Sequence, residues 1–129
     1  VSASTGTSNL TAIALEVHSS FTANRIYKEW DRRATGSSTS PATGATPATS
    51  QAASFSVAIV QAAAAQGSIT VGTSPVNWAQ LIEELTIAGA ATMEADTFTG
   101  AASGAVSASW TLATSAEWIA LVCTFGEVL

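Results

Sequence analysis

Apolar and polar residues alternate with a period of two in several short segments of the chain, which is the pattern of half-buried β-strands. In residues 54–61 the alternation places Phe55, Val57 and Ile59 on one face, which we expect to point inward. The last strand-like segment is apolar on both faces, which favours a central, covered position in a sheet. The segments predicted as strands are residues 10–18, 54–61, 68–71, 91–98, 105–112 and 117–125.

Two other segments fit more than one kind of element. Residues 76–88 have apolar residues at helical spacing, but alternate residues from Leu81 to Ile87 also fit a strand. We allow one short helix here, near residues 76–85. The four alanines at 62–65 favour a helix by propensity, but the run is short, and we predict that it continues the preceding strand.

Six or seven short strands separated by turn signals predict an all-β fold, an antiparallel β-sandwich. The chain of 129 residues has room for one domain, which we place at residues 9–129 after a flexible lead-in at residues 1–8. Residues 35–50 are of low complexity, with two Pro and two Gly, and are expected to form an extended segment at a sheet edge. Close to half of the chain is Ala, Ser or Thr. With so many small side chains, the four Trp must supply much of the core.

The charge is acidic overall and strongly segregated. A net charge of -5 disfavours nucleic acid as a partner. Residues 19–34 contain every basic residue and are predicted to form a long loop or a short helical turn. They form either a solvated loop of mixed charge or a subunit contact that meets the acidic body of a neighbouring copy. The four residues of this basic patch are Arg25, Lys28, Arg32 and Arg33.

Candidate chemistry is sparse, and we expect neither an enzyme nor a bound metal or cofactor. His18 is the only His and Cys123 the only Cys, and Cys123 lies in an apolar strand where a thiolate is disfavoured. Glu94 and Asp96 are two apart in a predicted strand and therefore share a face, which could contribute oxygen ligands to Ca²⁺. We favour a simpler interpretation, two carboxylates that face solvent.

The aromatic residues provide one candidate ligand site. Tyr27 and Trp30 lie in a polar and charged segment, where they could stack on a sugar ring. The other three tryptophans lie among apolar neighbours and are expected in the core. These are Trp78, Trp110 and Trp118.

The order of features from residue 9 to residue 127 resembles jelly-roll-like β-sandwich domains of phage tail and other virion proteins and of bacterial surface proteins. The stretches that carry the likeness are NLTAIALEVHS (9–19), TGSSTSPATGATPATSQAASFSVAIVQAAA (35–64), SPVNWAQLIEEL (74–85) and MEADTFTGAASGAVSASWTLATSAEWIALVCTF (93–125). They resemble the later two-thirds of such a domain. If the early strands are absent, a sheet edge is left bare and can pair with a neighbouring chain, with residues 1–18 as a candidate exchanged strand.

The resemblance implies a non-enzymatic structural subunit that self-assembles into a virion, as a decoration, tail or fibre protein, or into an extracellular filament. Partners would be further copies and other virion or surface proteins. No run of apolar residues is long enough for a membrane span, and we expect a virion, extracellular or cell-surface location. The alternative is a carbohydrate-binding surface module that uses Tyr27 and Trp30 to hold a glycan.

Overall fold

The described residues form an all-β structure with two antiparallel sheets and no helix, which confirms the predicted fold class. The computed structural model describes residues 25–49, 55–73, 78–87, 91–99 and 104–128. The lead-in predicted at residues 1–8 and the strand predicted at residues 10–18 lie outside these ranges. The strands are β1 (Arg25–Ser38), β2 (Phe55–Ala62), β3 (Ile69–Val71), β4 (Ala79–Ile87), β5 (Ala91–Thr99), β6 (Trp110–Leu112) and β7 (Ala116–Val128).

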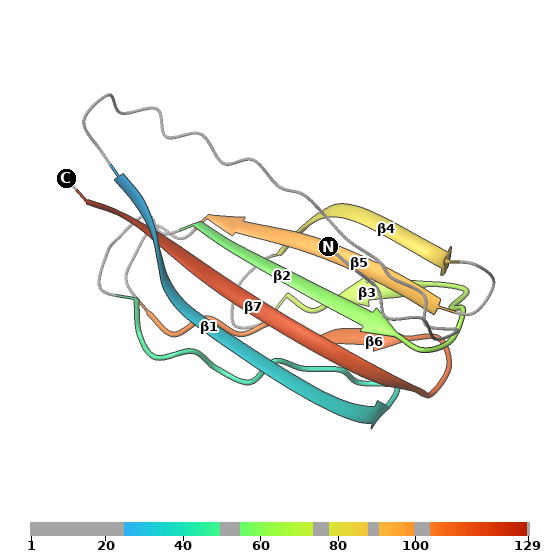
Figure 1. The fold of residues 1–129 in the computed structure, drawn as a ribbon. Coiled ribbons are helices and arrows are strands. Elements are labelled where there is room, and N and C mark those ends of the chain that lie inside the picture. Colours follow the sequence, from blue (N-terminus) through green and yellow to red (C-terminus); the bar gives the residue numbers. More distant parts are fainter. Residues whose placement is uncertain (1–24, 50–54, 74–77, 88–90, 100–103, 129) are drawn as a thin grey trace, which may run out of the picture.

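The larger sheet has five strands in the order β1-β7-β2-β5-β4, and the smaller sheet pairs β3 with β6 (Figure 1). The apolar strand β7 lies between β1 and β2, which confirms its predicted central position. The edges of the larger sheet are β1 and β4. The smaller sheet lies against one face of the larger one, and we call this face the inner face and the opposite one the outer face.

The inner face of β2 is opposite to the one that the alternation suggested. Ala58, Val60 and Ala62 are fully buried and belong to the core cluster, whereas Phe55 and Ile59 on the other face are only half-buried. Val57 lies on the same face as Phe55 and Ile59 and is buried, but it is not part of the core cluster. The prediction that Phe55, Val57 and Ile59 point inward, toward the second layer, is therefore wrong. Period two separates the faces of a strand, but the side that receives the second layer depends on the rest of the chain.

The predicted tryptophan core is confirmed. Trp78 and Trp110 are buried, and Trp118 packs against the same cluster of small aliphatic residues. The indole of Trp118 lies across Gly36 of β1, and its Nε1–H donates a hydrogen bond of 3.1 Å to Ser38 Oγ. A Cβ at Gly36 would lie 2.6 Å from the Trp118 ring, so this contact requires a residue without a side chain.

Three local predictions are corrected. The possible helix near residues 76–85 is instead strand β4, which pairs with β5. Helix propensity is worth only tenths of a kcal/mol per residue and is overridden by a sheet ladder. Likewise, much of the loop or helical turn predicted at 19–34 is strand β1, because β7 pairs with it from Arg25 onward. The alanines after residue 62 leave β2 and do not continue it.

The extended segment predicted at the edge is confirmed, and it pairs by an unusual ladder. Residues 41–49 read PATGATPAT, so that a Thr occurs at every third position. Each Thr donates its backbone N–H to a carbonyl of the facing segment 104–108, and its side-chain Oγ1 accepts the N–H of the same facing residue. The pairs are Thr43 with Ala108, Thr46 with Val106 and Thr49 with Gly104.

In this ladder three residues on one side match two on the other, and a threonine hydroxyl replaces the main-chain carbonyl as acceptor. The three hydroxyl-bearing residues are 1–4% exposed, so these hydrogen bonds are shielded from water. Because an unpaired buried N–H is costly, the threonines are needed for segment 41–49 to pair with segment 104–108. The segment extends the second layer beyond β6.

We predict that Thr46→Val lowers the free energy of unfolding by about 1–3 kcal/mol, because the Val106 N–H loses its acceptor. Urea unfolding followed by tryptophan fluorescence measures the change. The control is Thr70→Val, the same change at an exposed position of β3. Equal stabilities for the two variants would show that the hydroxyl ladder contributes nothing.

We also predict that Gly36→Ala destabilises the fold by about 1–3 kcal/mol, because the new methyl group collides with the anchored Trp118 indole. Thermal unfolding followed by circular dichroism measures this. Gly67→Ala is the matched control, since a Cβ there meets nothing within 4 Å. A Gly36 variant as stable as the Gly67 variant would contradict the proposed packing.

Candidate functional site

The whole basic patch lies on the edge strand β1. Arg32 and Arg33 are exposed, whereas Arg25 and Lys28 are placed on β1 by backbone register alone. Arg32 pairs with buried Val122 and so lies on the inner face, while Arg33 pairs with Leu121 and lies on the outer face. The patch is therefore part of a regular strand and not of a solvated loop.

A β-bulge in β1 arranges the two aromatic positions that the sequence singled out. The register shifts between Lys28 and Trp30, so positions 27 and 30 pair with Gly126 and Thr124, which are two apart on β7. Both positions consequently belong to the same face of the sheet. The Thr124 hydroxyl accepts the Trp30 N–H at 3.1 Å and donates to the Trp30 carbonyl at 3.4 Å. Trp30 is 40% exposed.

The opposite edge strand, β4, is acidic and partly apolar. Leu81 and Ile82 are each 48% exposed. Glu83 lies on the inner face, because it pairs with buried Glu94, and its Oε1 accepts the N–H of Ile69 at 3.2 Å. Glu84 pairs with Met93, so its position belongs to the outer face.

The outer face of the larger sheet carries apolar residues on its central strands. Phe55 of β2 contacts Phe125 of β7, with ring centroids 6.5 Å apart. Ile59 and Leu121 pair across the same two strands and are both half-buried. Ile119 is 44% exposed. The lone Cys123 is also on this face, opposite Val57, while its candidate partner His18 lies outside the described residues.

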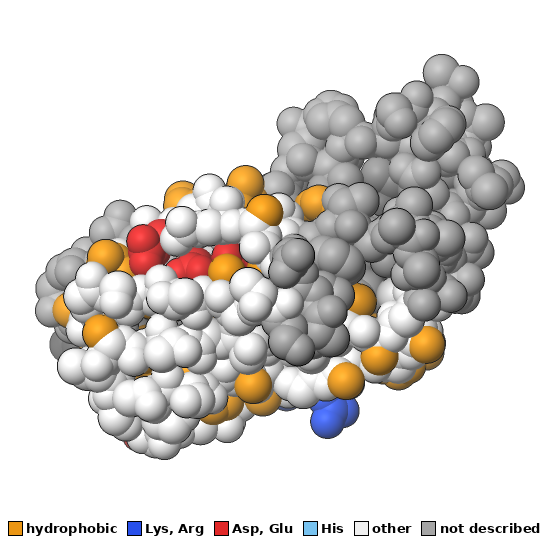
Figure 2. Space-filling view, turned by 180° about the vertical axis from the view of Figure 1, so that it is seen from behind, with side chains coloured by type: hydrophobic (Ala, Val, Ile, Leu, Met, Phe, Trp, Pro, Cys, Tyr) orange, Lys and Arg blue, Asp and Glu red, His pale blue; other side chains and the backbone are white. Residues whose placement is uncertain are grey.

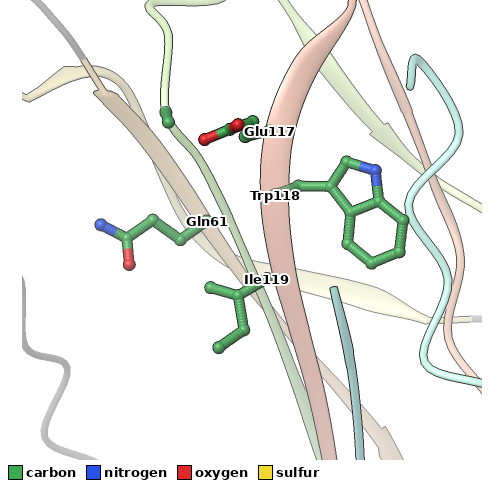
Figure 3. A pocket seen from close by; sticks show the side chains of 5 residues that line it. Gln61, Glu117, Trp118 and Ile119 are labelled. Atoms are coloured by element: carbon green, nitrogen blue, oxygen red, sulfur yellow. The ribbon is translucent and has the colours of Figure 1, made fainter. Parts of the chain in front are cut away.

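A shallow hollow of about 320 Å³ lies at one end of this face. Figure 3 shows that Gln61, Glu117 and Ile119 project on one side of β7, while Trp118 points away from them on the other. Ala63 completes the lining. The hollow holds one carboxylate and no basic side chain, so its chemistry favours apolar contact over anion binding.

The acid pair predicted on β5 is buried, which corrects the interpretation that it faces solvent. Glu94 and Asp96 are 1% and 0% exposed and point from β5 toward the core. The Nε1–H of Trp110, on the facing strand β6, donates to Asp96 Oδ2 at 2.7 Å. Asp96 Oδ1 and both Glu94 oxygens lack a hydrogen-bond partner of good geometry among the described residues.

Burial, together with the neighbouring charges of Asp96 and Glu83, raises the pKa of Glu94 to about 8, while the Gln80 side chain acts in the opposite direction. Burial also raises the pKa of Asp96, against the hydrogen bonds from Trp110 and Glu94. A proton shared by the pair relieves the repulsion between the two carboxylates. Figure 2 shows acidic side chains gathered in one recess, well apart from a basic side chain at the lower edge.

This acid pair can hold and release a proton. Within the described residues no group of three His, Cys, Asp or Glu side chains is arranged to hold a metal ion. Nor does any helix there have the length and apolar character needed to cross a membrane.

Comparisons with protein-family models, with curated proteins and with solved structures found no match. The proposed function therefore rests on the geometry of the sheet.

Sequence reasoning located the basic and aromatic residues but missed the two features that distinguish this sheet. Glu94 and Asp96 alternate with Met93 and Ala95, which is the pattern of an ordinary strand whose acidic face is exposed to solvent. No local signal marks that face as buried, because Trp110 approaches it only in the folded chain. The apolar outer face did have a signal, the double-sided apolar pattern of residues 117–125.

We predict that the protein is more stable at mildly acid pH than at pH 8. Glu94 loses its proton near its ordinary pKa of 4.5 in the unfolded chain but only near 8 in the folded one, so stability falls as pH rises between these values. In the Glu94→Gln variant, stability should decrease less between pH 5 and pH 8. Melting temperatures at pH 5 to 8 measure it, with Glu117→Gln, an exposed carboxyl on β7, as control. Parallel profiles for wild type and Glu94→Gln would contradict the role of the pair.

Proposed function

We propose that this chain is a non-enzymatic structural subunit that self-assembles through its larger sheet, in a virion (as a decoration, tail or fibre protein) or in an extracellular filament. The supporting observation is that the central strands β2 and β7 carry apolar residues on both faces, while among the described residues the second layer covers only the inner one. Burying apolar surface is worth about 25 cal/mol per Å², so the half-buried apolar residues of the outer face, together with the 44% exposed Ile119, favour association.

A second copy is the occupant that the charges favour. The edge strand β1 carries every basic residue of a chain whose net charge is -5. A basic strand on an otherwise acidic molecule is attracted to the acidic surface of another copy. The exposed Leu81, Ile82 and Ile119 then provide apolar area for contact between copies.

A repeated structural role also suits the small-residue composition and the resemblance to β-sandwich domains of virion and bacterial surface proteins. Such subunits need a stable sandwich with adhesive surfaces and no reactive group. We place the protein on a virion, outside the cell or at the cell surface.

Glycan binding is the second candidate, and one observation favours it. The bulge at Lys28–Trp30 brings positions 27 and 30 to the same face of β1, and Trp30 is 40% exposed. Two aromatic side chains on one face form a platform for a sugar ring. A screen of soluble glycans against a Trp30→Ala variant would test this function separately.

We predict that the purified 129-residue chain forms oligomers or polymers that persist on dilution. Native mass spectrometry across a dilution series measures this. Ile119→Asp, which places a charge on the outer face, should weaken assembly about tenfold or more, because that charge must be desolvated at the contact. Thr70→Asp, at an exposed site of the smaller sheet, is the matched control. A 13.0 kDa monomer at all concentrations would rule out the structural role.

A further inference from the structure

The two edges of the larger sheet carry consecutive charged residues of opposite sign. β1 contains Arg32 and Arg33, and β4 contains Glu83 and Glu84. We propose that copies join edge to edge, with β1 of one copy beside β4 of the next and the arginine pair against the glutamate pair. The five-stranded sheet then continues from copy to copy. This inference rests on the proposed self-assembling function and adds an edge contact to the outer-face contact proposed above.

In each charge pair the two positions belong to opposite faces of the sheet. Arg32 lies on the inner face and Arg33 on the outer face. Position 83 lies on the inner face and position 84 on the outer face of β4. On each edge, therefore, one of the two charged positions belongs to the inner face and the other to the outer face, so the positions on the two edges correspond.

Both pairs lie in regular stretches of their strands. In β1 the irregularity between Lys28 and Trp30 precedes the arginines, and β7 pairs without interruption from Trp30 to Ser38. In β4 the shifts occur at Gln80/Ile82 and Glu84/Ile87, so the glutamates lie within the regular stretch between them. Regular backbone at the charged positions allows a neighbouring strand to hydrogen-bond there.

The complementarity does not depend on the direction of pairing. All neighbours in the sheet are antiparallel, so β1 and β4 run the same way. A neighbour related by a simple shift pairs in parallel, and the inner charges then meet inner charges. A neighbour that is also turned over pairs antiparallel, and Arg32 then meets Glu84 while Arg33 meets Glu83. Each arginine faces a glutamate in both cases.

The same charges oppose the other edge pairings. Two β1 edges aligned at the arginine pair, or two β4 edges aligned at the glutamate pair, would bring like charges together, which is costly. The allowed contact is therefore heterologous, with different surfaces on its two sides. Such contacts close into rings or continue into filaments. Glu83 is already held by the Ile69 N–H, which reduces the entropy lost on contact.

The test uses two charge-reversed variants of the full chain. Arg32→Glu/Arg33→Glu makes both edges acidic, and Glu83→Arg/Glu84→Arg makes both edges basic. We expect each variant alone to need at least about a tenfold higher concentration than wild type to assemble. An equimolar mixture should assemble as wild type does, with the two variants alternating, because each altered edge finds an opposite partner.

Circular dichroism confirms that each variant is folded before it is compared. Because Glu83 also binds the Ile69 N–H, Glu84→Arg alone replaces the second variant if the double change unfolds the protein. Arg33→Lys, which retains the charge on β1, is the matched control and should assemble as wild type. Assembly is measured by native mass spectrometry and light scattering.

The outcomes separate this inference from the function on which it rests. A monomeric wild type overturns the self-assembling function itself. A wild type that assembles, together with an Arg32→Glu/Arg33→Glu variant that assembles equally well, overturns the edge pairing and leaves the function intact. Two folded variants that fail alone and also fail when mixed overturn it as well, because the two charge pairs then do not meet each other.

Discussion

The structure depends on the backbone pairing of β7 with a strand on either side. β1 and β2 hydrogen-bond to it over most of its length, and this ladder brings residues about 55 to 105 positions apart in the chain into register. The side chains of β7 on the inner face lie under the second layer. Those on the outer face are also mostly apolar, although an antiparallel sheet allows polar residues on an uncovered face. The apolar outer face is thus a property of the β7 and β2 sequences and not a requirement of the pairing.

The inner face is closed with small side chains, and this determines how the second layer is built. Alanines and valines of β2 and β7 allow the layers to approach, and the large indoles of Trp78 and Trp110 fill the space between them. The threonine segment 41–49 then completes the layer with hydroxyl groups where a regular strand would use carbonyls. The buried pair of Glu94 and Asp96 is the costly exception. It orients Trp110 across the layers and makes stability depend on a shared proton.

The proposed assembly uses surfaces that the monomer fold leaves open. The sheet has an arginine pair on one edge, a glutamate pair on the other and exposed aliphatic residues, so the element that organises the monomer would also supply its contacts. In this proposal the charged side chains give the contact its direction, because they oppose the pairing of like charges, and the aliphatic residues add buried apolar area. Bulges interrupt the regular backbone of both edge strands, which limits indiscriminate pairing.

The sequence by itself determined the all-β class, most strand positions, the central position of β7, the tryptophan core and the clustering of basic residues, because these depend on local periodicity and composition. It predicted a loop or helical turn over much of β1 and allowed a helix where β4 forms. A strand that is stabilised mainly by pairing with a distant segment has only a weak signal in its own residues. Only the tertiary structure decided which face of β2 is inner, that Glu94 and Asp96 are buried, and that Arg32 and Glu83 lie on opposite edges. Each of these depends on which distant segment packs alongside, and alternation within one strand contains no information about its neighbours.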